Sequence, residues 1–270
     1  MHLVPPEHGR ARWISNLVST VKFAYSLFIY FAVAGCLSAQ ATRAGPTSEA
    51  IIARMASAQA GNQTHFRPYI VTRYYKLLGP DSRFGFKSHV TAEITVVPPD
   101  FKKYVIDDSD GSSWGEKVVR KILDSEVAFA KDSAATNITR DNYDFRFLRE
   151  DELDGQHCYV LELLPKRRSR DLLRGIIWLD TGTYLPHRVE GEPAKSPSWW
   201  LKDVHIVLRY GYLGTMWLQT SSEASADVRI LGQTTIASQS VKYRIETSAP
   251  ATSLVQTIIA VGETTTASKP

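Results

Sequence analysis

The sequence predicts a mainly β fold of the α+β class, in which a large antiparallel sheet is accompanied by two helices inserted early. Three observations favour this class. Apolar and polar side chains alternate with a period of two in most segments between residues 69 and 245. The connections between the later strands, such as residues 180–183 and 211–215, are too short for a parallel crossover. Two earlier segments carry apolar residues at helical spacing instead.

The chain begins with the pattern of a secretory signal. An uncharged apolar run at residues 23–37 follows several basic residues and is shorter than the roughly 20 residues that a membrane-spanning helix needs. Small residues directly precede Cys36. This pattern resembles the lipobox of bacterial lipoproteins, in which the cysteine is acylated and becomes the new N-terminus. Residues 1–35 are therefore predicted to be a lipoprotein-type signal peptide. Two alternatives stay open, which are ordinary cleavage after residue 41 to release a soluble protein, and an uncut signal anchor.

Composition and charge narrow the class of protein. The chain of 270 residues has a formal net charge of +4, and the signal segment carries +2 of this, so the mature chain keeps only +2. Such a small charge does not indicate a nucleic-acid partner. With Cys36 assigned to the signal region, Cys158 remains alone, so we expect no intrachain disulfide and a fold that depends on its hydrophobic core.

Two helices are expected in the mature chain. Thr47 or Ser48 is placed to cap the first helix. Ser113 and Glu116 have the spacing of a capping box, which predicts that Ser113 is the N-cap of a second helix ending near Lys131. The apolar faces of the two helices carry Ile51, Met55, Val119, Ile122 and Leu123.

The remaining elements are predicted to be strands. Residues 69–78 are rich in β-branched and aromatic side chains, and residues 89–96 alternate strictly, so the two are expected to form a hairpin. Residues 101–106 read as a short third strand, and residues 143–245 as a long series of strands and turns. One domain is expected over residues 42–246, and the Ser-, Thr- and Pro-rich residues 247–270 are expected to be a flexible tail.

Two segments resemble those of a known family. Residues 175–189 form an apolar strand that ends in Asp180, a tight turn, and a return strand starting with Pro186, and residues 154–163 look like the strand before it. Together with the order of helix, three strands, helix and long sheet, they resemble the LolA/LolB-like superfamily. The resemblance implies a curved, incompletely closed β-barrel whose concave apolar face is covered by helices, leaving a cavity for acyl chains. Related proteins carry lipoproteins or other lipids in the envelope, or act as envelope-stress sensors.

Several apolar residues are candidates for lining such a cavity. A large sheet with one apolar face needs a cover, and two helices leave room in a wide trough for a ligand. The alternative is a close-packed inner face without a cavity. Alternation by itself does not decide which face of a strand points inward. We expect a lid formed by Ile51, Met55, Val119, Ile122 and Leu123 over a cavity lined by Ile94, Trp178, Ile206 and Leu208.

Residues 111–115 form a G-x-S-x-G motif, which is also the pattern of a hydrolase nucleophile elbow. A serine hydrolase would use Ser113 as its nucleophile. The acid and base would come from later residues, which are Asp180 or Asp203 and His187 or His205. No βαβ units surround the motif, and Ser113 has a sufficient role as a helix cap, so a structural role is the favoured interpretation.

The densest basic segment follows the strand at residues 154–163. It is expected either to be a solvated hairpin tip or to contact anionic lipid headgroups at a membrane surface. Its residues are Lys166, Arg167, Arg168 and Arg170. The histidines show neither HExxH nor paired-carboxylate spacing, so no metal site is expected.

The sequence therefore predicts an exported lipid- or lipoprotein-binding protein of the bacterial cell envelope, involved in lipoprotein sorting or transport. It is expected in the periplasm or at the outer membrane, anchored through Cys36, with acyl chains as its ligand and no catalytic activity, cofactor or metal. The first alternative is an envelope-stress sensor or structural factor that binds a protein partner. The second is the serine hydrolase using Ser113.

Overall fold

The computed structural model describes residues 46–79, 87–229 and 232–245. The predicted signal, Cys36 and the predicted tail lie outside these residues. The helices are α2 (Ser48–Gln63), α3 (Ser113–Lys131) and the short α4 (Ser133–Thr136). The strands are β1 (Tyr69–Leu78), β2 (Lys87–Val97), β3 (Phe101–Gly111), β4 (Tyr143–Leu153), β5 (Gln156–Pro165), β6 (Leu173–Asp180), β7 (Pro186–Pro193), β8 (Leu201–Leu213), β9 (Met216–Val228) and β10 (Gly232–Ile245).

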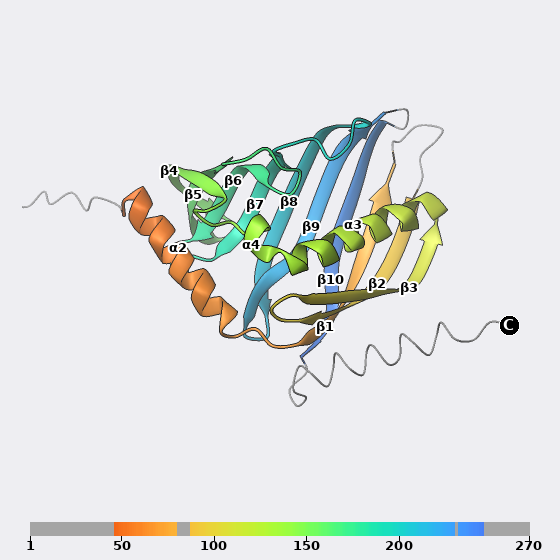
Figure 1. Ribbon diagram of the computed structural model, residues 1–270, viewed down its shortest axis with the longest axis horizontal. Coiled ribbons are helices and arrows are strands. Elements are labelled where there is room, and N and C mark those ends of the chain that lie inside the picture. Colours follow the sequence, from red (N-terminus) through yellow and green to blue (C-terminus); the bar gives the residue numbers. More distant parts are fainter. Residues whose placement is uncertain (1–45, 80–86, 230–231, 246–270) are drawn as a thin grey trace, which may run out of the picture. The chain divides into compact units, whose positions relative to one another are not determined.

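The ten strands form one open antiparallel sheet (Figure 1). Their order is β3-β2-β1-β10-β9-β8-β7-β6-β5-β4, so two runs of sequential neighbours are joined by the pairing of β1 with β10. β3 and β4 are the two edges and do not pair with each other, so the sheet does not close into a barrel. The predicted mainly β fold, with an incomplete antiparallel barrel and helices inserted early, is confirmed.

One predicted strand is longer than expected. β3 continues from Phe101 to Gly111, whereas the apolar pattern indicated an end near Ile106. The added residues include several aspartates, which are exposed at the edge of the sheet, while their backbone still pairs with β2 as far as Ser88. Alternation stops where a strand no longer buries side chains, but backbone hydrogen bonding continues beyond that point.

The second helix begins as predicted, but its cap is a different residue. Ser112, in extended conformation, is the N-cap of α3, and its Oγ accepts a hydrogen bond from the Trp114 backbone N–H at 3.2 Å. Ser113 is the first residue of the helix, and Glu116 pairs with Arg120 at 2.7 Å rather than closing a capping box. The prediction that Ser113 is the N-cap was therefore wrong by one position.

Two buried clusters fix the helices on the same face of the sheet, which we call the inner face. The α2 cluster joins buried residues of α2 to β4, β5, β6 and β7, and the α3 cluster joins α3 to β1 and β2. Figure 1 shows α2 near the β4 end of the sheet and α3 near the β3 end. The central strands β8 to β10 therefore lie between the two helix-covered ends.

Candidate functional site

The register of the strands identifies the inner face residue by residue. Cross-strand partners share a face, and the series from Leu163 on β5 runs through Gly175, Gly191 and Ile206 to Ala224 on β9. Leu163 belongs to the α2 cluster, so this series marks the side on which the helices pack. Three predicted lining residues have side chains on the inner face, and these are Ile94, Ile206 and Leu208.

Trp178, the fourth predicted lining residue, lies on the opposite, outer face. It packs with Cys158 and Val160 in a separate buried cluster, and the Arg188 guanidinium lies 5.4 Å from its ring centroid. Its chain neighbour Ile177 points inward instead. The prediction that Trp178 lines an inner cavity was therefore wrong. Because β6 carries apolar residues on both faces, its sequence does not indicate which of them point toward the helices.

Cys158 is fully buried in the same outer cluster. Burial raises the pKa of its thiol to about 11, and the negative charges of Asp180, Asp151 and Asp154 add to this shift. The thiol is therefore protonated at neutral pH and has no nucleophilic role.

Most of the predicted lid residues are packed core rather than cavity walls. Ile51 and Met55 are 0% and 1% exposed within the α2 cluster, against residues of β5 to β7. Val119 and Leu123 are equally buried within the α3 cluster, where Ile94 also lies. Ile122 is half-buried. The two helices thus cover the two ends of the sheet with separate, close-packed contacts, and the predicted lid residues do not meet over a single hollow.

The pocket that the structure describes lies between these ends, where the last turns of α2, the segment after α4 and the start of β9 meet. Its volume is about 370 Å³, within the range of roughly 300–1,000 Å³ for small-molecule sites. Its apolar lining includes Leu173, Leu185, Leu208, Tyr210, Trp217 and Leu218. Its polar lining includes Gln59, Asn62, Gln63, Asn137, Thr139 and Gln219. Of the nine residues predicted from the sequence to bind lipid, Leu208 alone is among the lining residues.

The walls of this pocket are held by specific hydrogen bonds. Asn62 at the end of α2 accepts from the Trp217 backbone N–H at 2.9 Å and donates to the Trp217 carbonyl at 2.8 Å. The Trp217 indole N–H donates to the Pro186 carbonyl at 2.7 Å, which fixes the ring. The Asn142 amide donates to the Asn137 carbonyl at 2.8 Å and orders the segment after α4. Three wall segments far apart in the sequence are therefore joined.

The pocket is electrically neutral apart from one carboxylate. No lysine or arginine is among the described residues that line it, and Asp171 is the one charged lining residue. Burial raises the pKa of Tyr210 to about 12, and burial also raises the pKa of Tyr143. Both phenols therefore stay protonated at neutral pH and can act as hydrogen-bond donors. Sequence patterns could not reveal this set, because its members come from loops and strand ends without a common period.

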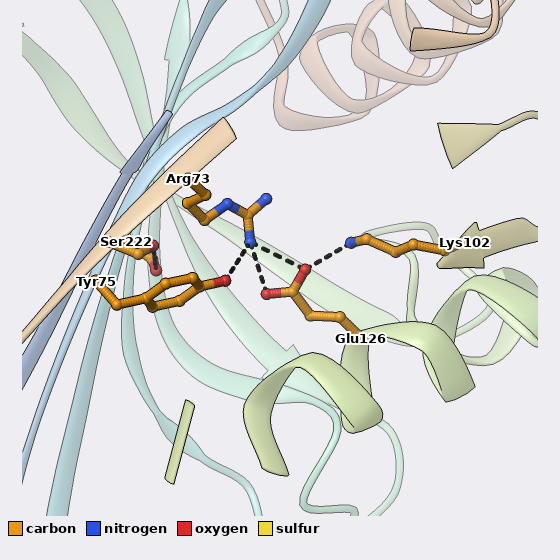
Figure 2. Close-up of polar contacts among 6 residues, drawn as sticks. Arg73, Tyr75, Lys102, Glu126 and Ser222 are labelled. Carbon is orange, nitrogen blue, oxygen red and sulfur yellow. Dashed lines mark hydrogen bonds and ion pairs between the residues drawn. The ribbon is translucent and has the colours of Figure 1, made fainter. Parts of the chain in front are cut away.

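A charged network lies beneath α3 on the inner face (Figure 2). Arg73 Nη1 on β1 contacts both Glu126 oxygens at 2.8 and 3.0 Å and donates to the Tyr75 hydroxyl at 3.1 Å. Lys102 Nζ on β3 contacts Glu126 Oε2 at 2.5 Å. Burial alone would raise the pKa of Glu126, but the charges of Arg73 and Lys102 outweigh it and lower the pKa. The network therefore ties α3 to two strands through one ionised carboxylate.

All four residues of the basic segment after β5 are exposed, but two of them also make structural contacts. Lys166 donates to the Arg140 carbonyl at 2.6 Å, and Arg167 donates to Asn142 Oδ1 at 2.6 Å, so both hold the segment after α4 in place. Arg168 and Arg170 are exposed, and Arg170 lies 4.0 Å from Asp171. Two of the four residues are thus also tied to the fold, and contact of this segment with a membrane surface stays a prediction.

The contacts around the G-x-S-x-G motif are those of a helix start. Gly111 has a φ of +93°, a backbone conformation that favours glycine, and a Cβ on Gly115 would clash with Ser88 Oγ. Structural requirements therefore account for the presence of glycine at both positions. Three of the four candidate triad partners are engaged elsewhere. His187 pairs with Asp154 at 3.6 Å, His205 pairs with Glu190 at 3.1 Å, and Asp180 caps its own turn. Nothing in these contacts supports Ser113 as a nucleophile.

Within residues 46–79, 87–229 and 232–245, no three His, Cys, Asp or Glu side chains are grouped to hold a metal ion. No helix in the same ranges is long and apolar enough to cross a membrane.

Comparisons with known proteins gave one family match and several structural matches. A family model described as "-like: Uncharacterized protein" matches residues 120–250. No curated protein is significantly similar in sequence. A solved outer membrane lipoprotein-sorting protein domain from Vibrio parahaemolyticus is 14% identical, with a TM-score of 0.45, and the match covers 76% of this chain and 96% of that one. A LolA superfamily protein from Nitrosomonas europaea is 11% identical with a TM-score of 0.35, over 76% and 96%. The Mycobacterium tuberculosis lipoprotein LppX is 12% identical with a TM-score of 0.25, over 76% and 100%.

The architecture of the chain itself agrees with the fold that its sequence predicts. It has the predicted order of one helix, three strands, a second helix and a long antiparallel sheet. The sheet is open, and both long helices pack on one face of it.

Proposed function

We propose that the protein binds the acyl chain of a lipid or lipoprotein in the pocket between α2, α4 and β9. The observation that carries this proposal is a cavity of about 370 Å³ on the helix-covered face of an open sheet, with Leu208 and Leu218 in its lining. Apolar side chains that line such a cavity gain free energy when a ligand covers them. The close-packed α2 and α3 clusters on either side provide the rigid support.

The size of the pocket limits the affinity that an acyl chain alone can supply. Burying about eight methylenes gains roughly 6 kcal/mol. Association costs of about 4–15 kcal/mol are of the same order as this gain, so an acyl chain alone is expected to bind weakly and to exchange easily. A carrier needs both capture and release, and this balance is compatible with that role.

The place of action rests on the N-terminal sequence pattern, which lies outside the described residues. We propose that the protein is exported to the periplasm or the outer membrane and is anchored there through acylated Cys36. A role in lipoprotein sorting or transport would follow from acyl-chain binding at that location. An intact mass corresponding to an unmodified chain that starts at Thr42 would exclude the anchor.

The acyl-binding proposal is tested with two tryptophan substitutions and a fluorescent fatty-acyl probe. Leu208→Trp fills the pocket, so we expect saturable probe binding by the wild type and at least about tenfold weaker binding by this variant, a change of roughly 1.4 kcal/mol. Met55 lies in the packed α2 cluster, so Met55→Trp should instead lower stability by about 1–3 kcal/mol. Absence of saturable binding by the wild type would contradict the proposal.

A further inference from the structure

The pocket lining includes five neutral polar side chains that make no hydrogen bond within the described fold. Gln59 and Gln63 come from α2, Asn137 and Thr139 from the segment after α4, and Gln219 from β9. None of these five side chains has a hydrogen-bond partner among residues 46–79, 87–229 and 232–245. Asn62 is different, because both ends of its amide are bound to Trp217. The pocket thus combines an apolar lining with several unengaged amides and hydroxyls.

The charges around the pocket disfavour an anionic ligand group. Asp171 contributes a carboxylate to the lining, and its Oδ2 accepts from the Ser169 hydroxyl at 3.1 Å. The nearby cations Lys166 and Arg167 donate to the Arg140 carbonyl and to Asn142 Oδ1, and Arg170 lies 4.0 Å from the Asp171 carboxylate. None of these three cations is part of the lining. A phosphate or carboxylate placed here would lose water without gaining a cationic partner, which is costly.

We propose that the pocket selects a lipid whose polar group is neutral and rich in hydroxyls, such as a sugar or a glycerol. This inference rests on the acyl-binding function proposed above and names the class of headgroup. A primary amide offers both donors and acceptors, so Gln59, Gln63 and Gln219 can each pair with hydroxyls in either direction. The protonated phenols of Tyr143 and Tyr210 add donors at the same site. An acyl chain beside Leu208 would supply the apolar contact.

The test compares compounds that share one dodecyl chain and differ in the polar group. Dodecyl maltoside, dodecyl phosphate and free maltose are titrated separately below micelle-forming concentrations, and binding is followed by calorimetry. We expect dodecyl maltoside to bind at least about tenfold more tightly than dodecyl phosphate, since the lining contains the Asp171 carboxylate and no lysine or arginine that would pair with the phosphate. Free maltose should bind more weakly than dodecyl maltoside, because it lacks the apolar contact.

Variants of the unengaged amides sharpen the test. The double variant Gln63→Leu with Gln219→Leu should lose the preference for maltoside while dodecyl phosphate binding stays within about twofold. Gln239→Leu, which changes an exposed residue outside the pocket, serves as the matched control and should bind as the wild type does.

The outcomes separate the two proposals. Equal affinity of the wild type for dodecyl maltoside and dodecyl phosphate would overturn the headgroup inference and leave acyl binding in place. Failure of both dodecyl compounds to bind would overturn acyl binding itself. Free maltose binding as tightly as dodecyl maltoside would support a polyhydroxyl site and contradict the acyl function.

Discussion

The side-chain amide of Asn62 pairs with the backbone of Trp217 as a neighbouring strand would. β10 pairs with β9 only from Ser221 to Val228, so β10 does not cover the start of β9. Asn62 accepts from the Trp217 N–H and donates to its carbonyl at 2.9 and 2.8 Å. The end of α2 therefore takes the place of the missing strand and closes one side of the pocket.

Asn62→Ala is expected to lower the free energy of unfolding by about 1–3 kcal/mol, because two backbone groups of Trp217 lose their partners. Hydrogen exchange of the Trp217 amide should accelerate along with this loss, and urea unfolding would measure the stability change. Ser57→Ala, at an exposed position of the same helix, is the control and should be near neutral. A slow-exchanging Trp217 amide in the Asn62 variant would show that the contact is dispensable.

Glu126→Leu is expected to be strongly destabilising, by about 3–5 kcal/mol, because Arg73 and Lys102 would be left under α3 without a counter-charge. The double variant Arg73→Met with Glu126→Leu should recover much of this loss, since apolar groups replace the pair. The exposed pair Glu116–Arg120 provides a comparison, because its loss should cost less than about 1 kcal/mol. Chemical denaturation measures all of these effects.

The ion pairs of Glu126 with Arg73 and Lys102 also predict that the stability of the fold depends on pH. The folded state lowers the pKa of Glu126 below its ordinary value of 4.5, so its stabilising contribution is fully present above that pH and is lost as the pH falls through the folded-state pKa. Glu126→Gln should therefore show a shallower decline of stability with acidification than the wild type. If the free energy of unfolding of the two proteins fell in parallel below pH 4.5, Glu126 would not be the group responsible for the pH dependence.

Ser112→Ala is expected to cost about 1 kcal/mol of stability, because the Trp114 N–H loses the oxygen that caps α3. Ser113→Ala should have little effect, because Ser113 is exposed in the first turn. Thermal unfolding of the two variants distinguishes these positions. A fluorophosphonate probe that labelled Ser113 in the wild type would reopen the hydrolase interpretation.

The sequence by itself determined the strands, the helices and the antiparallel class. Periodicity depends on which side chains are buried within one element, so it located the two long helices α2 and α3 and the strands β1 and β2, and it marked residues 143–245 as strands and turns. It did not separate Ser112 from Ser113, because adjacent serines can each cap a helix and only the backbone geometry selects one. It ended β3 too early, because an edge strand keeps its pairing after it stops burying side chains.

Only the tertiary structure decided the faces and the pocket. Ile177 and Trp178 are adjacent apolar residues on opposite faces, and cross-strand packing alone decides which of them meets α2. Met55 and Leu123 looked like lid residues, but each is enclosed in its own close-packed cluster. The pocket joins Gln63, Thr139 and Gln219 from three separate segments. Such a site arises from contacts between residues far apart in the chain, which local periodicity does not encode.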